Sequence, residues 1–177
     1  MNSVSPQGNR MAAAATEYCE LIDGFGGSGH ETTWVARVGK MLPRLHVAVI
    51  ALVPSGEICN PYRFPDDDEH CECYMRLHRV LQSDRTLKLA YGNSHLRQQT
   101  CDRLADDFTD IYFDLKFGLD LLNSDPSHAI NVWQCSFYMH WGQHLLDAEC
   151  RLNAVEAGEK PLHLSGWGWP RLSFAGM

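Results

Sequence analysis

Two long segments with helical periodicity, joined by a very short connection, constrain this fold more than any other feature. Residues 100–123 carry apolar side chains three and four positions apart, which is the spacing of one helix face. Residues 126–157 continue with a second helical pattern. Between them, Asp125 is a favourable N-cap and Pro126 a favourable first helical residue. Because the connection is so short, we expect the two helices to be antiparallel neighbours.

Apolar periodicity elsewhere in the chain also favours helices. The predicted helices cover residues 10–23, 31–52, 66–83, 100–123 (with a possible earlier start at Ser94) and 126–157. Pro43 lies inside the second of these, where it predicts a kink or a break. Residues 84–93 have a short alternating pattern, which favours an extended crossing segment.

These elements predict an all-α fold. We expect a single-domain bundle of about five helices, with the fourth and fifth as its central antiparallel pair. The bundle would span residues 10–158, after a disordered tail at 1–9. Residues 159–177, rich in aromatic residues, glycine and proline, would form an irregular tail packed on the bundle.

Composition excludes several classes of partner. A net charge of −7 and a pI near 5.6 argue against binding to nucleic acid or to an anionic membrane. No apolar run approaches the roughly 20 residues needed to cross a bilayer. The seven cysteines are odd in number and follow no signal peptide, which favours a reduced, cytoplasmic location. His70, Cys71 and Cys73 form only a weak zinc pattern, because no second cysteine pair accompanies them.

A stripe of polar side chains runs along the fifth predicted helix. His140 and His144 are four residues apart and therefore lie on the same helix face. Asp147 and Arg151 continue this stripe. We expect Asp147, Arg151 and the neighbouring Trp141 to form a structural polar network around the two histidines, because an unpaired buried polar group costs about 1–3 kcal/mol.

The fourth predicted helix offers acidic partners for this stripe. Asp107 and Asp114 flank its apolar face two turns apart, with Asp110 on the same side. Three interpretations follow: a purely structural network, a metal site formed by the three aspartates with His140 and His144, and acid–base catalysis by a histidine that an aspartate orients. The Glu-x-x-His spacing of di-iron bundles and the His-Glu-x-x-His motif of zinc proteases are both absent from the sequence.

The same two helices resemble a bacterial protein family, domain of unknown function 5063. The resemblance rests on Asp106 to Lys116, on Trp133 and Phe137, and on the motif His-Trp-Gly-x-His at 140–144. It implies an all-helical single domain and brings no established activity, substrate or ligand.

The sequence therefore leads to two functional hypotheses. The first is a non-enzymatic binding or protein-interaction module with an unknown protein or small-molecule partner, because no catalytic set of residues is complete. The alternative is a metal-binding protein or metal-dependent enzyme that uses the Asp/His cluster, in which case the cofactor would be a divalent transition metal.

Overall fold

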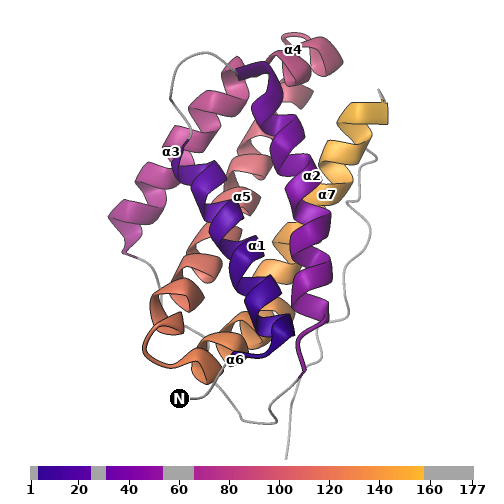
Figure 1. The fold of residues 1–177 in the computed structure, drawn as a ribbon. Coiled ribbons are helices and arrows are strands. Elements are labelled where there is room, and N and C mark those ends of the chain that lie inside the picture. Colours follow the sequence, from indigo (N-terminus) through magenta and orange to yellow (C-terminus); the bar gives the residue numbers. More distant parts are fainter. Residues whose placement is uncertain (1–3, 25–30, 54–65, 158–177) are drawn as a thin grey trace, which may run out of the picture.

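The fold is entirely helical over the part of the chain that the structure, a computed structural model, describes: residues 4–24, 31–53 and 66–157 (Figure 1). The helices are α1 (Pro6–Asp23), α2 (Glu31–Ile50), α3 (Asp67–Ser83), α4 (Arg85–Tyr91), α5 (His95–Leu122), α6 (Pro126–Ser136) and α7 (Gly142–Ala157), with a π-helical turn (Phe137–Trp141) between α6 and α7. No strand occurs within these ranges. The predicted single-domain helical bundle is confirmed.

Helix α5 lies at the centre of the bundle. It packs against α1, α3, α6 and α7 (Figure 1). Two buried rings of neighbouring helices donate hydrogen bonds to its backbone. The Tyr18 hydroxyl donates to the Phe108 carbonyl at 3.0 Å, and the Trp133 indole donates to the Leu115 carbonyl at 3.0 Å. The Trp133 ring lies directly over Gly118, where a Cβ atom would overlap it. The predicted antiparallel arrangement of the two long helical segments is also found.

The last helical segment is less central than its sequence pattern suggests. Met139 and Leu146 belong to a second apolar side of this segment, yet their exposed fractions are 64% and 43%. A helix that is apolar on two sides is usually enclosed by the core. Here only one of the two sides faces the bundle core, and the other is largely open to solvent.

Two helical boundaries differ from the prediction for local reasons. Helix α1 begins at Pro6, earlier than expected, because the Ser5 hydroxyl accepts a hydrogen bond from the Gly8 N–H at 3.0 Å and caps the helix. Helix α5 begins at His95, with Ser94 as its N-cap, which is the earlier of the two expected starts. Pro43 does not divide α2 into two helices.

The prediction of an extended segment at 84–93 is wrong, since Arg85–Tyr91 form α4. The Asp84 carboxylate accepts hydrogen bonds from the Thr86 and Leu87 N–H groups at 2.8 and 3.1 Å, and this cap starts the helix. Leu87 is buried whereas Leu89 is 76% exposed, so the alternation of apolar residues does not mark a sheet face.

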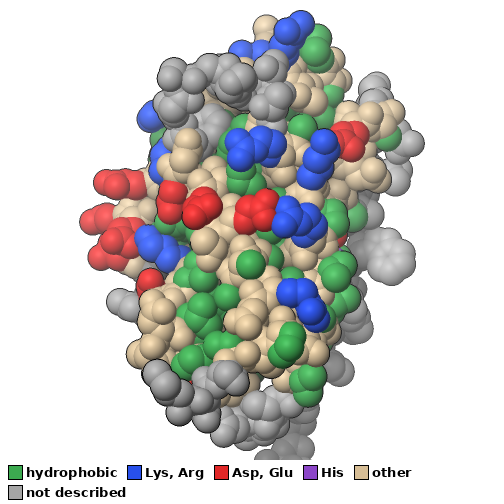
Figure 2. Space-filling model, viewed as in Figure 1, with side chains coloured by type: hydrophobic (Ala, Val, Ile, Leu, Met, Phe, Trp, Pro, Cys, Tyr) green, Lys and Arg blue, Asp and Glu red, His purple; other side chains and the backbone are tan. Residues whose placement is uncertain are grey.

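Figure 2 shows acidic side chains gathered over the beginning of α3, whose first turn contains Asp67, Asp68 and Glu69. Carboxylates in this position interact favourably with the helix dipole. None of the described helices is both long and apolar enough to span a bilayer. The glycine-rich connector at 25–30 and the expected tail at 159–177 lie outside the described residues.

The cysteines only partly match the expectation of reduced thiols. Cys19, Cys73 and Cys101 are buried free thiols, as expected for small core residues, and Cys71 is exposed. Cys135 is disulfide-bonded, so the thiols are not uniformly reduced.

Candidate functional site

The π-helical turn that carries His140 is the local irregularity nearest the predicted site. The Gly142 N–H donates to the Phe137 carbonyl five residues earlier, which inserts one extra residue into the helix. A side chain at Gly142 would collide with that carbonyl, and the Phe137 ring lies 3.1 Å from the position of its Cβ. The glycine is therefore required by close approach of backbone and ring. Such π-turns occur frequently at functional sites.

Each of the two predicted histidines is held by one aspartate of α5. His140 Nδ1 lies 2.6 Å from Asp114 Oδ2, and His144 Nδ1 lies 3.0 Å from Asp107 Oδ1. The two imidazole centroids are 5.1 Å apart. A carboxylate at Nδ1 fixes both the orientation of an imidazole and the position of its proton. Each ring is thus oriented through its own Nδ1 atom by a carboxylate of α5.

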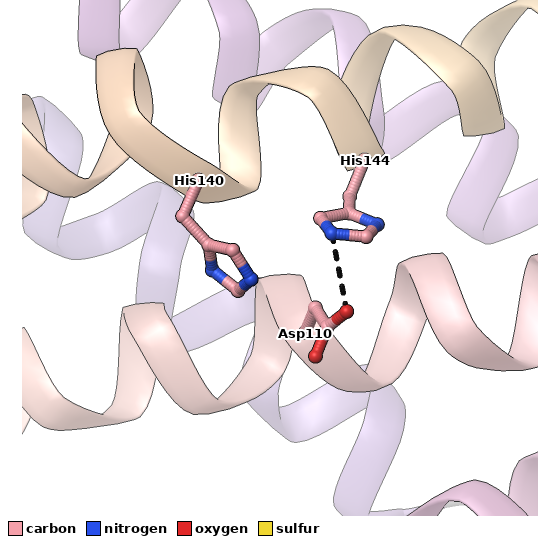
Figure 3. A group of neighbouring side chains, drawn as sticks. All are labelled: Asp110, His140 and His144. Atoms are coloured by element: carbon pink, nitrogen blue, oxygen red, sulfur yellow. Dashed lines mark ion pairs between the residues drawn. The ribbon is translucent and has the colours of Figure 1, made fainter. Parts of the chain in front are cut away.

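Asp110 lies between these two pairs and is the centre of the site (Figure 3). Its Oδ2 is 3.1 Å from His144 Nε2, and its Oδ1 is 2.8 Å from His70 Nε2. One potential ligand atom from each of Asp110, His140 and His144 lies within 4.8 Å of the others. All three residues are partly buried, with side-chain exposures of 17%, 31% and 23%. The structure thus brings together all five predicted metal-site residues, three of them as a compact group.

The remaining predicted network residues lie around this group. Arg151 Nε is 3.4 Å from Asp107 Oδ2, and Arg151 reaches Asp147 at 4.0 Å. Gln143 also donates to Asp147 at 3.1 Å. Trp141 is fully buried, and its indole donates to the hydroxyl of Ser136 at 2.9 Å. Trp141 therefore supports the helix from the core side, whereas Arg151 contacts the aspartates directly.

Burial and charge act in opposite directions on the ionisable groups of the site. The hydrogen bond to Asp114 raises the pKa of His140 above its usual 6.5, despite partial burial. Burial alone would lower the pKa of His144, but the hydrogen bond to Asp107 and the charges of Asp110 and Asp107 outweigh it, so this pKa is also raised. Burial raises the pKa of Asp107. Two basic imidazoles thus lie among carboxylates, an arrangement that can hold either protons or a cation.

His70 is the residue of this site that the sequence pattern did not reveal. It belongs to α3, far from the other residues in the chain, and its ring stacks on Phe113 with centroids 5.3 Å apart. A second pair of the same type, His78 Nε2 to Asp102 Oδ1 at 2.8 Å, joins α3 and α5 two turns away. Asp102 is 43% exposed, so that pair lies on the surface. The antiparallel packing of α3 on α5 creates both pairs, and a lone histidine gives no local signal of such packing.

The fold and the site define the class of this protein: an all-helical bundle whose central helix α5 forms a histidine–aspartate cluster with the π-turn, α7 and α3. The chain belongs to the family described as domain of unknown function 5063, whose model matches residues 2–158. The structure is similar to the crystal structure of protein BF1032 from Bacteroides fragilis, with a TM-score of 0.63 and 19% sequence identity over 86% of this chain and 96% of that one. This likeness concerns the fold alone. No curated protein matches the chain.

Proposed function

We propose that this protein binds a divalent transition-metal ion through Asp110, His140 and His144. The observation that supports the proposal most strongly is the pairing of both Nδ1 atoms with carboxylates. This pairing makes Nε2 the ring atom that would coordinate an ion. Histidine ligands in metalloproteins almost always donate their other ring N–H to a carboxylate, a carbonyl or a water, and a carboxylate partner raises the basicity of the ligand. Asp107 and Asp114 would have this supporting role.

The spacing of the three residues is close to that of a coordination sphere. Ligands about 2.0–2.2 Å from an ion can lie at most about 4.4 Å apart. The ligand atoms here lie within 4.8 Å of one another, so small side-chain rotations suffice to close the site. Without a metal, a proton on His144 Nε2 can satisfy the contact with Asp110 at 3.1 Å. An ion would therefore replace that proton.

The chemistry of these donors narrows the choice of ion. Two imidazole nitrogens with one carboxylate suit Zn²⁺, Fe²⁺, Mn²⁺ or Ni²⁺, whereas Mg²⁺ and Ca²⁺ prefer sites made of oxygen atoms alone. Among the described residues, no cysteine sulfur joins the compact group of Asp110, His140 and His144, and these three donors do not favour ions that select thiolate, such as Cu⁺.

Elemental analysis and calorimetric titration of the untagged full chain with Zn²⁺, Mn²⁺ and Fe²⁺ test the proposal. We expect one equivalent to bind, and binding to be lost in His144→Ala and in Asp110→Ala. His78→Ala is the control and should still bind the ion. His78 also pairs with an aspartate of α5, at 2.8 Å, but it lies away from the three ligands. Absence of stoichiometric binding, or binding that survives in His144→Ala, would contradict the proposal.

A metal-dependent enzyme is the second candidate function. Three protein ligands leave at least one position for water or another small ligand, as in catalytic zinc sites. The partial exposure of His140 supports solvent access to this position. In the Co²⁺-loaded protein, added azide should change the visible absorption spectrum. An unchanged spectrum at saturating azide would argue against an open position and hence against catalysis at the ion.

A further inference from the structure

A groove between α2 and α7 lies apart from the histidine–aspartate cluster. It has a volume of about 530 Å³, and Gly39, Pro43, Ile50, Cys150 and Leu152 belong to its lining. The two helices are antiparallel. Gly39, in the first half of α2, lies against Leu152 near the end of α7. At the opposite end, Gln134, which precedes α7, donates to the Leu52 carbonyl just after α2.

The α2 side of the groove has exposed apolar side chains. Val47 and Ile50 line it with exposed fractions of 64% and 56%. Val53, three residues after the end of α2, is 73% exposed. Adjacent exposed apolar side chains typically mark a surface that another segment or another protein contacts.

Two hydrogen-bond acceptors in the groove lack their usual partners. Pro43 has no N–H, so the Gly39 carbonyl lacks its normal partner within α2. The Glu149 Oε1 atom is buried and, among the described residues, has no hydrogen-bond partner, although its Oε2 lies 3.4 Å from His46 Nδ1. A buried acceptor such as Glu149 Oε1 normally has a hydrogen-bond partner. The groove therefore fits an occupant that combines apolar surface with N–H donors and positive charge.

We propose that residues 159–177 of the same chain occupy this groove. These residues follow directly after α7, which ends at Ala157 beside the groove residue Glu156. They contain Trp167 and Trp169, and each indole combines a large apolar surface with one N–H donor. Lys160 and Arg171 supply positive charge for a groove that is lined by Glu149 and Glu156.

The length of the segment fits this placement. Between Ala157 and Trp167 the chain can extend by up to about 33 Å. The stretch of α2 from Gly39 to Ile50 is only about 17 Å long at 1.5 Å per residue. Both tryptophans can therefore reach any point of the groove. The proposal does not depend on metal binding.

Two free cysteines provide the test. Both are exposed in the described structure, and Cys150 lines the groove whereas Cys71, on α3, lies outside it. Alkylation by N-ethylmaleimide is followed for each cysteine by mass spectrometry, in the full chain and in the full-chain double variant Trp167→Ala/Trp169→Ala. We expect the rate at Cys150 to rise about ten-fold in the variant, which corresponds to about 1.4 kcal/mol of docking free energy, with the rate at Cys71 unchanged.

The other outcomes would overturn the proposal. Equal Cys150 rates in the two proteins would mean that the tryptophans do not cover the groove. Cys150 protection that increases with protein concentration, together with a dimer in size-exclusion chromatography, would assign the groove to a second copy of the chain. A rise at Cys71 as large as at Cys150 would indicate general loosening of the fold instead of release of this segment.

Discussion

Replacement of Asp107 tests whether the buried part of the histidine–aspartate cluster stabilises the fold. The Asp107 side chain is only 6% exposed, and it contacts His144 at 3.0 Å and Arg151 at 3.4 Å. Removal of one member of a buried charged pair costs about 3–5 kcal/mol when the partner stays buried and unpaired. Here His144 and Arg151 are 23% and 22% exposed, so water can partly replace the lost contacts.

A second effect lowers the expected cost further. Burial raises the pKa of Asp107, which means that its charged form is penalised by desolvation and that this penalty disappears with the side chain. We therefore expect Asp107→Ala to lower the free energy of unfolding by about 2 kcal/mol, which is less than the cost of breaking a fully buried pair.

Urea unfolding followed by circular dichroism at pH 7, with a chelator present to remove metal ions, measures this difference. Asp102→Ala is the matched control, because Asp102 binds His78 at 2.8 Å on the same helix but is 43% exposed. An exposed pair contributes about 0–1 kcal/mol, so the control should lose at most about half as much stability as Asp107→Ala. If the two variants lose equal stability, burial does not determine the strength of these pairs and the reasoning fails.

Three further predictions concern the same region. The pKa values of His140 and His144 are raised in the folded state, so their contribution to stability is complete below the usual value of 6.5 and is lost as the pH rises through the raised values. In urea unfolding of the metal-free protein, the stability lost in the His140→Ala/His144→Ala variant should therefore be larger at pH 6 than at pH 9. Gly142→Ala should destabilise the protein by about 1–3 kcal/mol, because the added Cβ would collide with the Phe137 carbonyl. Alanine favours helices more than glycine does, so a gain in stability in the same assay would disprove the collision. His70→Ala should weaken Zn²⁺ binding about ten-fold in calorimetry, because His70 orients the Asp110 carboxylate from outside the coordination sphere, and an unchanged affinity would exclude this role.

Much of the fold follows from local patterns in the sequence. Asp125 and Pro126 mark the turn between the two long helical segments, since a cap and a fixed backbone angle act within a few residues. The same local reasoning failed at residues 84–93, where alternating apolar residues resemble a strand. The Asp84 cap makes this segment helical, and contacts with the rest of the bundle bury Leu87 alone among its leucines.

Apart from His70, the residues that the structure brings together at the candidate site could be named from the sequence, but their geometry could not. Helical spacing alone places Asp107, Asp110 and Asp114 on one side of the first long helical segment. It also places His140 and His144 on one side of the second segment. It does not show that Asp114 and Asp107 each bind an Nδ1 atom, or that Asp110 contacts the other side of His144. The π-turn at Phe137–Trp141 also has no counterpart in a regular helical wheel, because its extra residue shifts the helix faces on either side of it.

By itself, then, the sequence determined the helical class, the antiparallel relation of α5 with the helical segment that follows, and the aspartates and histidines that these two segments bring together. Each of these depends on periodicity or on contacts between residues near one another in the chain. Only the tertiary structure decided that His70 joins Asp110 and that Trp141 faces the core, because these placements depend on how α3, α5 and α7 pack. It also decided that Val47 and Ile50 are left exposed beside α7. Packing between distant segments is set by the shapes of whole helix faces, which no local spacing rule contains.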